Sequence, residues 1–289
     1  MKRYLLVVTG LFLLSSCQDV IEVDTPTETP RLSVDALLRI DESKPMTDIT
    51  IRAGLTSSFF GDIESADLDD IRIVNPDYKP VGAKDQNFVV LTQSESSPGR
   101  YEASKNTSFF TDGRLELSIV YGDKRYRAST RYVPTVPIDT LIQGEGGLFT
   151  DDETEVLVSF TDDPNRNDFY LFDFDYNEYL VTEDEFYQGQ TFEFSYFYDE
   201  DVTPGMEISV DLLGVDEGFY NYMNQLTVQA GGSQGPFQTP AATVRGNIIR
   251  VSDGSVDGTG TTNAPSDKGD FVLGYFAVCQ TFTETIEIE

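Results

Sequence analysis

The sequence predicts a mostly β protein in which an N-terminal immunoglobulin-like sandwich precedes a second, acidic β-rich domain with one principal helix. Three observations support this fold class. Apolar residues alternate with polar ones in both halves, turn-forming residues separate the alternating stretches, and the charge balance changes sharply near residues 133–137. The chain has 289 residues, 39% of them hydrophobic, which is enough for two domains with their own cores.

Four alternating stretches in the first half predict strands. Apolar side chains recur at every second position in residues 32–40, 49–55, 115–121 and 126–132. A period of two places these side chains on one face of a strand, as expected for a sheet with one buried face. Short strands joined by Gly- and Asp-containing turns, such as residues 121–123, are typical of a β-sandwich.

The second half alternates in the same way over residues 156–160, 170–176, 192–198 and 206–212. The polar residues between the apolar ones are largely Asp, Glu and Ser. These stretches predict a second domain that is also rich in strands.

One principal helix is predicted over residues 216–228. Asp216 can cap its N-terminus, and Gly231 and Gly232 follow its C-terminus. The residues on its apolar face are Phe219, Tyr222, Met223 and Leu226.

The acidic residues are concentrated in the second half. Residues 30–137 contain 16 acidic and 14 basic side chains, whereas residues 138–289 contain 30 acidic and 4 basic ones. The change falls at residues 133–137, whose two prolines suit a connection between domains. We therefore expect the domains to occupy residues 30–137 and 138–289. The formal net charge of −30 would repel a phosphate backbone, so nucleic acid is excluded as a partner.

The N-terminus predicts a cleaved signal and a lipid anchor. A positively charged start precedes an apolar run at residues 4–14, which is too short to span a bilayer and suits a signal peptide. Residues 14–17, Leu-Ser-Ser-Cys, resemble the lipobox of bacterial lipoproteins. We expect residues 1–16 to be removed and Cys17 to carry lipid that holds the protein at a membrane. The alternative is an ordinary secretory signal that ends by chance in a cysteine.

Residues 17–29 follow as an acidic stretch rich in Pro and Thr, which predicts an extended tether. With Cys17 lipidated, Cys279 has no cysteine left to pair with. It adjoins the apolar residues 276–278, so we expect it to be a thiol buried in the core.

The composition removes several kinds of catalytic site. Histidine is absent, which excludes a His-based triad, a His general base and a His-containing zinc site. The G-x-S-x-G and P-loop patterns are also absent. We therefore assign no catalytic residue and no cofactor-binding residue.

Paired carboxylates leave one enzymatic alternative open. Acidic groups cluster at residues 151–153, 162–163, 183–185 and 199–201, and a glycosidase needs two carboxylates about 5–10 Å apart. Tryptophan, on which sugar rings commonly stack, is absent. A solvated acidic surface that keeps the protein soluble explains the same residues.

A calcium site is the one metal site that the sequence suggests. Asp163, Asn165 and Asn167 place side-chain oxygens at alternate positions, as the start of a calcium loop does. The loop lacks the Gly at its sixth position and the Glu at its twelfth, where this chain has Asp168 and Phe174. A turn built from Asx residues before a strand explains the same pattern.

Several short motifs resemble a family of Bacteroidota lipoproteins known as domain of unknown function 4249. The residues that carry the resemblance are 32–35, 136–139, 235–237, 246–248 and 273–276, with Tyr220, Tyr222 and Pro240. The chain departs from the family pattern at two places. It has Gly235 where the family has Asn, and Ile249 and Arg250 where the family has a pair of glycines. Gly246 suits a turn, and Gly274 suits a bulge or a close backbone approach inside a strand.

The resemblance implies a partner but no activity. Members of the family are commonly encoded beside TonB-dependent outer-membrane receptors, and acidic residues after the lipidated cysteine resemble the export signal of surface-exposed lipoproteins. We therefore expect a non-catalytic accessory or binding lipoprotein, anchored in the outer membrane and facing the exterior, with such a receptor as partner. The alternative is an envelope hydrolase that uses carboxylates, such as a glycosidase.

Overall fold

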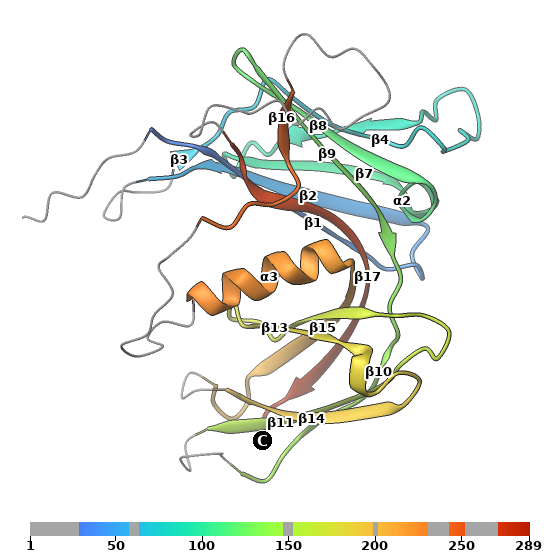
Figure 1. Ribbon diagram of the computed structural model, residues 1–289, viewed down its shortest axis with the longest axis vertical. Helices are drawn as coiled ribbons and strands as arrows, with labels where there is room; N and C mark the ends of the chain where they lie inside the picture. Colours follow the sequence, from blue (N-terminus) through green and yellow to red (C-terminus); the bar gives the residue numbers. More distant parts are fainter. Residues whose placement is uncertain (1–28, 58–63, 147–152, 199–201, 231–242, 252–270) are drawn as a thin grey trace, which may run out of the picture.

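The structure is a computed structural model that describes residues 29–57, 64–146, 153–198, 202–230, 243–251 and 271–289 (Figure 1). Its described part is mostly β, as predicted. The predicted signal peptide, the lipidation site at Cys17 and all but the last residue of the tether lie outside the described residues. Among the described residues, no helix has the length and apolar character needed to cross a membrane.

The first unit is a β-sandwich with the strand order of an immunoglobulin-like domain. One layer has the order β1-β2-β7-β6 and the other the order β5-β4-β8-β9. These match the A-B-E-D and C′-C-F-G orders of the immunoglobulin fold. The elements are β1 (Leu32–Ile40), β2 (Met46–Leu55), β3 (Glu64–Ser65), β4 (Asp70–Val74), β5 (Phe88–Val90), β6 (Thr92–Gln93), β7 (Arg100–Asn106), the short α2 (Thr107–Thr111), β8 (Arg114–Tyr121) and β9 (Lys124–Val133).

Alternation of apolar residues builds the core of this sandwich. Val34, Ala36, Leu38 and Ile40 of β1 are essentially inaccessible to solvent, whereas the residues between them face away from the core. Burying one such aliphatic side chain contributes about 1.5–3 kcal/mol. The outward face of β1 is therefore free to carry polar residues at no cost to the core.

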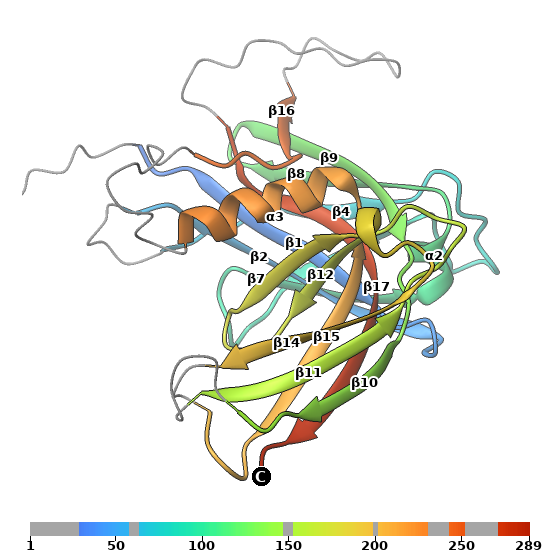
Figure 2. The same ribbon diagram turned by 60° about the horizontal axis from the view of Figure 1, so that its bottom comes forward.

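The second unit is a smaller β-sandwich. A three-stranded sheet of β10 (Ile138–Gln143), β11 (Thr154–Thr161) and β14 (Thr191–Tyr198) faces a sheet formed by β12 (Phe169–Asp173), β13 (Tyr179–Glu183), β15 (Glu207–Val215) and β17 (Leu273–Glu287) (Figure 2). Aromatic rings fill the space between them: Phe160 contacts Tyr170 and Phe172 at centroid distances of 5.0 and 5.5 Å. The turn η2 (Asp184–Phe186) follows β13.

Strand β17 belongs to both units. Its residues 273–280 pair in parallel with β1, and residues 281–287 pair with β15 in the antiparallel direction. The short β16 (Ile249–Val251) likewise pairs with β9. The expected division into residues 30–137 and 138–289 therefore needs a correction, because β16 and the first half of β17 complete the N-terminal sandwich. The charge pattern divides the chain at one point along the sequence, so it could not indicate that C-terminal strands pair with the N-terminal sandwich.

Two glycines let the backbones approach closely where β17 enters the sandwich. Gly274 has a φ of +101°, and a Cβ there would lie 1.8 Å from the carbonyl oxygen of Val34. A Cβ on Gly246 would lie 1.7 Å from the carbonyl oxygen of Gly274. The amide of Asn247 donates to the carbonyl of Phe276 and accepts from its N–H, both at 2.8 Å. The close approach predicted at Gly274 is confirmed.

The principal helix is α3 (Glu217–Ala230), close to the predicted range. Asp216 caps it as predicted, because its Oδ1 accepts a hydrogen bond from the Phe219 N–H at 2.7 Å. Phe219 is buried, and Tyr222 and Met223 pack against a small core that includes Ala277 and Cys279. In both views α3 lies between the strands of the N-terminal sandwich and β13 and β15 (Figures 1 and 2). The glycines expected to end the helix lie outside the described residues.

Candidate functional site

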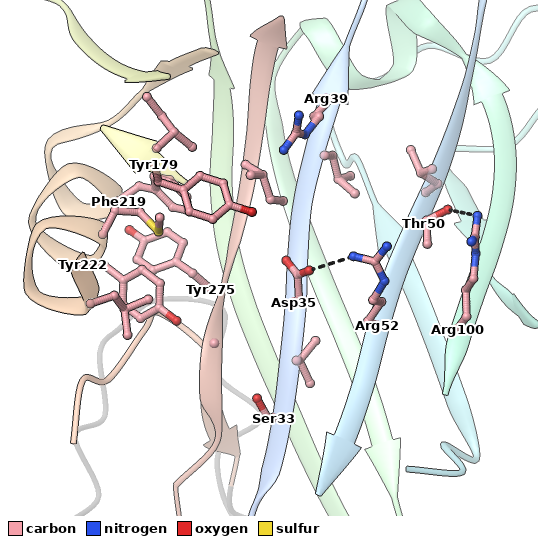
Figure 3. A pocket seen from close by; sticks show the side chains of 18 of the residues that line it. Ser33, Asp35, Arg39, Thr50, Arg52, Arg100, Tyr179, Phe219, Tyr222 and Tyr275 are labelled. Atoms are coloured by element: carbon pink, nitrogen blue, oxygen red, sulfur yellow. Dashed lines mark hydrogen bonds and ion pairs between the residues drawn. The ribbon is translucent and has the colours of Figure 1, made fainter. Parts of the chain in front are cut away.

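An open cavity of about 520 Å³ lies between α3 and the outward face of β1 and β2 (Figure 3). We call it the α3 groove. One side is formed by aromatic residues of α3, β13 and β17, and the other by polar residues of β1, β2 and β7. The alternation of β1 explains the second side: even-numbered residues enter the sandwich core, so Ser33, Asp35 and Arg39 face the groove.

The aromatic wall consists of Tyr179, Phe219, Tyr222 and Tyr275. The ring of Tyr275 meets Phe219 nearly at right angles and Tyr222 at a tilt, with centroid distances of 5.1 Å in both cases. The hydroxyl of Tyr275 lies 3.4 Å from Asp216 Oδ1, the same oxygen that caps α3. The cap, the helix and β17 thereby hold one another in place. The wall is a set of packed rings with several hydroxyls.

Three tyrosine hydroxyls of the wall keep their protons at neutral pH. Burial raises the pKa of Tyr222, and the nearby carboxylate of Asp35 adds to the effect. Burial and Asp173 raise the pKa of Tyr179, and burial and Asp216 raise that of Tyr275. A protonated phenol can donate a hydrogen bond to a ligand.

The opposite side of the groove is its floor, where polar residues of the strands lie. Asp35 of β1 lies directly across from Arg52 of β2, and the two side chains form an ion pair at 3.5 Å. Both are largely exposed, at 62% and 70% of their side-chain surface. Arg100 of β7 lies beyond Arg52 and contacts Thr50 at 3.5 Å (Figure 3). It also forms an ion pair with Glu102 at 2.6 Å.

The far end of the groove is closed by Arg39. Its guanidinium bridges Asp173 of β12 and Asp211 of β15, so it ties the N-terminal sandwich to the second unit. Burial opposes its charge, but the two carboxylates outweigh that effect and raise the pKa of Arg39. Arg39 is thus a structural clamp.

At its other end the groove continues into a second hollow of about 690 Å³. Ser33, Asp35, Arg52 and Arg100 line both. The second hollow adds small polar residues and loop backbone from β2, β3 and the turn before β7. The groove therefore has one closed and one open end.

The residues proposed for calcium form a hydrogen-bonded turn. Asp163 Oδ1 accepts from the backbone N–H and the side-chain amide of Asn165, both at 3.0 Å, and Asp163 Oδ2 faces Arg166 at 3.4 Å. The side-chain oxygen of Asn167 accepts from Gln188 at 3.0 Å. This is the Asx turn that the sequence left as the alternative. No group of three or more Cys, Asp or Glu side chains in the described part of the chain is arranged to hold a metal ion.

Three buried carboxylates of the second unit, Asp162, Asp168 and Asp184, serve the fold, whereas residues 151–152 and 199–201 lie outside the described residues. Asp162 accepts from the Tyr170 hydroxyl and from the Gly189 N–H, and Asp184 accepts from the Asp168 N–H. Burial raises the pKa of Asp168, while Arg166 at 2.9 Å opposes the rise. These side chains are buried and do not line the α3 groove.

Cys279 is a buried thiol, as predicted. Burial raises its pKa well above the ordinary value, so it carries no thiolate at neutral pH. It lies beneath the closed end of the groove, opposite Arg39 in the pairing of β1 and β17.

Sequence reasoning identified part of the groove and missed the rest. Tyr222 was placed on the apolar face of the helix, and Asp35 and Tyr275 fall within the motifs of the family resemblance. Arg52 and Arg100 carried no signal, because a polar residue at an outward strand position has the same pattern whether it faces solvent or a helix. A mixed aromatic and polar cleft of this size is the usual form of a ligand-binding site.

Comparison with known sequences gives the class of protein. The sequence pattern of the family described as domain of unknown function (DUF4249) matches residues 18–268. The chain belongs to this family, which confirms the family named from its motifs. The match ends before β17 begins, although β17 joins the two units. No curated protein sequence matches the chain significantly.

Proposed function

We propose that the protein is a non-catalytic binding lipoprotein of the outer membrane that works beside a TonB-dependent receptor. Lipid on Cys17 would hold it at the membrane, with the folded part facing the exterior. The observation that carries the proposal is the α3 groove, an open cavity of about 520 Å³ with an aromatic wall and a charged floor. Ligand sites in proteins combine these features.

The chain order supports delivery to a neighbour in the same membrane. The expected tether, residues 17–29, ends two residues before β1, which forms part of the groove floor. Thirteen extended residues span at most about 45 Å. A protein on such a tether would reach a receptor embedded beside it without leaving the membrane.

The spacing of groove carboxylates favours binding over hydrolysis. Asp35 and Asp48 are the two carboxylates that line the groove. Asp35 lies across from Arg52, and Asp48 is four residues from Arg52 along β2, which places the Cα atoms of the two outward-facing aspartates roughly 14 Å apart. A glycosidase needs its carboxylates within about 5–10 Å. The hydrolase alternative therefore finds no support in the groove.

The proposal is tested by purifying the native protein from detergent-solubilised outer membranes and identifying what co-purifies by mass spectrometry. We expect a TonB-dependent receptor in stoichiometric amounts with the unaltered chain. A Cys17→Ser variant should be lost from the membrane and from the receptor complex. Enrichment of no such receptor, or unchanged membrane retention of Cys17→Ser, would refute the proposal.

A second measurement addresses catalysis. The chain should release no product from a panel of oligosaccharides and glycopeptides. Turnover that disappears in Asp35→Asn would show that the groove is an active site.

A further inference from the structure

We infer that the α3 groove takes an organic carboxylate with a flat apolar body, the carboxylate held by Arg52 and the body packed against the aromatic wall. This inference rests on the proposed binding function and names the class of ligand. Two features favour such a ligand: the guanidinium of Arg52 has free donors, and aromatic rings lie across the groove from it. The pairing of β1 and β2 on both sides leaves only side chains to bind the ligand.

Arg52 has unused hydrogen-bonding capacity. Within the described part of the chain its one contact is the ion pair with Asp35 at 3.5 Å, which is longer than a hydrogen bond, and 70% of its side chain is exposed. A guanidinium carries five N–H donors in a planar fork that matches a carboxylate. Figure 3 shows Arg52 on the floor of the groove, between Asp35 and the contact of Arg100 with Thr50.

Arg52 is the groove arginine whose guanidinium is left for a ligand. Of the three arginines that line the groove, Arg39 is held by Asp173 and Asp211 and Arg100 by Glu102. The wall adds the hydroxyls of Tyr179 and Tyr222, which are donors in their protonated form, whereas the hydroxyl of Tyr275 faces Asp216. Repulsion from distant acidic residues is screened beyond about 8 Å at physiological salt. Local donors therefore decide what binds.

The aromatic wall selects the body of the ligand. Tyr222 and Tyr275 lie across the groove from Asp35 and Arg52 (Figure 3). Aromatic side chains prefer a flat apolar partner, which they contact by offset stacking or edge to face. A ligand that contacts both the aromatic wall and Arg52 therefore has a flat apolar part and an anionic group.

Recognition of an extended peptide by strand addition is excluded at this floor. β1 is paired on both sides, with β17 and β2, and β2 is paired with β1 and β7. Their backbone groups are already used, and strand addition needs a free sheet edge. Only side chains can hold the ligand.

The test compares 2-naphthoate with 2-naphthamide, a neutral molecule of nearly the same shape, by calorimetric titration. The protein used is the chain from Gln18 to Glu289, which contains every described strand and helix. We expect the carboxylate to bind at least ten-fold more tightly than the amide. Arg52→Gln should abolish this preference, Arg52→Lys should restore part of it, and Tyr222→Ala should weaken both ligands.

Arg114→Gln is the matched control, because Arg114 is an exposed, ion-paired arginine of the same sandwich that does not line the groove. It should leave both affinities unchanged. Equal affinity for the two probes, an Arg52→Gln variant that still prefers the carboxylate, or binding of neither probe would overturn the inference. Co-purification with the receptor is measured separately, so the proposed function can stand when the ligand class fails.

Discussion

The two ends of the α3 groove each present an arginine from the outward face of a strand, and the two arginines differ in their partners. At the closed end Arg39 is clamped between Asp173 and Asp211, with 36% of its side chain exposed. At the open end Arg52 has one loose contact with Asp35 and is 70% exposed. The same residue type joins the two units at one end and is available to a ligand at the other.

This difference teaches that partners, and not residue type, decide what a charged side chain does. A pair of carboxylates held by two strands consumes the donors of Arg39. Removing a partner from such a group leaves uncompensated charge, whereas removing an exposed ion pair costs little. Substituting Arg39 should therefore lower stability more than substituting Arg52. Substituting Arg52 should weaken ligand binding more than substituting Arg39.

The largest expected loss of stability lies in the backbone that supports the open end. Gly274→Ala would force an alanine into a positive φ and place its Cβ 1.8 Å from the Val34 oxygen. We expect the free energy of unfolding to fall by about 3–5 kcal/mol, measured by urea denaturation. Gly82→Ala is the control, because Gly82 has a similar φ of +98° and nothing within 4 Å of the new Cβ. Equal losses in the two variants would show that the close approach is not costly.

The fold could be predicted from the sequence to the extent that it is local. Alternation specified strands such as β1 because its buried residues repeat with the period of a strand. The cap residue Asp216 and the apolar residues that follow it at helical spacing predicted α3, because both signals lie within one short segment. The pairing of β17 with both β1 and β15 was not predictable, because these strands are distant in sequence and the residues of β17 do not indicate which strands it pairs with.

The site was predictable only where residues carried a signal of their own. Tyr222 repeats with the helical period and Tyr275 falls in a family motif. Arg52 has the pattern of any outward strand residue, and only the helix that crosses the sheet makes it part of a groove. At the predicted calcium loop the alternate side-chain oxygens did carry a signal, and there Asp163 forms an Asx turn with Asn165, while calcium binding stays a prediction.

The clamp at the closed end should give the next largest effect. Arg39→Met leaves Asp173 and Asp211 facing each other without a cation. Partial exposure moderates the cost, so we expect a loss of about 1–2 kcal/mol in the free energy of unfolding. Arg114→Met, at an exposed pair, should change stability by less than about 0.5 kcal/mol. A loss no greater than that of this control would show that the clamp does not join the units.

The rate of thiol labelling at Cys279 measures how accessible the closed end of the groove is to reagents. Cys279 is buried and its pKa is raised, so both access and thiolate are lacking in the folded protein. In the chain from Gln18 we expect labelling by an aromatic disulfide reagent at pH 8 to be at least about 100-fold slower than in denaturant. Arg39→Met should raise the rate in the folded state, whereas Arg52→Met should not. Rapid labelling of the unaltered protein would contradict the closed end.

The cap of α3 should contribute less. Asp216→Ala removes the acceptor of the Phe219 N–H, and we expect a loss of about 1 kcal/mol. Asp216→Asn retains a side-chain oxygen and should lose less than half of that. Hydrogen exchange at the first turn of α3 is the sharper measurement, because the cap acts there first. Unchanged exchange in Asp216→Ala would show that packing alone positions the helix.

The smallest expected change in stability belongs to the residue with the largest expected role in binding. Arg52→Gln removes an exposed contact of 3.5 Å, so the free energy of unfolding should change by no more than about 0.5 kcal/mol. Arg39→Met should show the opposite combination, with a marked loss of stability and an undiminished preference of the groove for a carboxylate, because the donors of Arg39 are already engaged. If Arg52→Gln unfolded the protein as readily as Arg39→Met, Arg52 would be a second clamp, and the difference between the two ends of the groove would disappear.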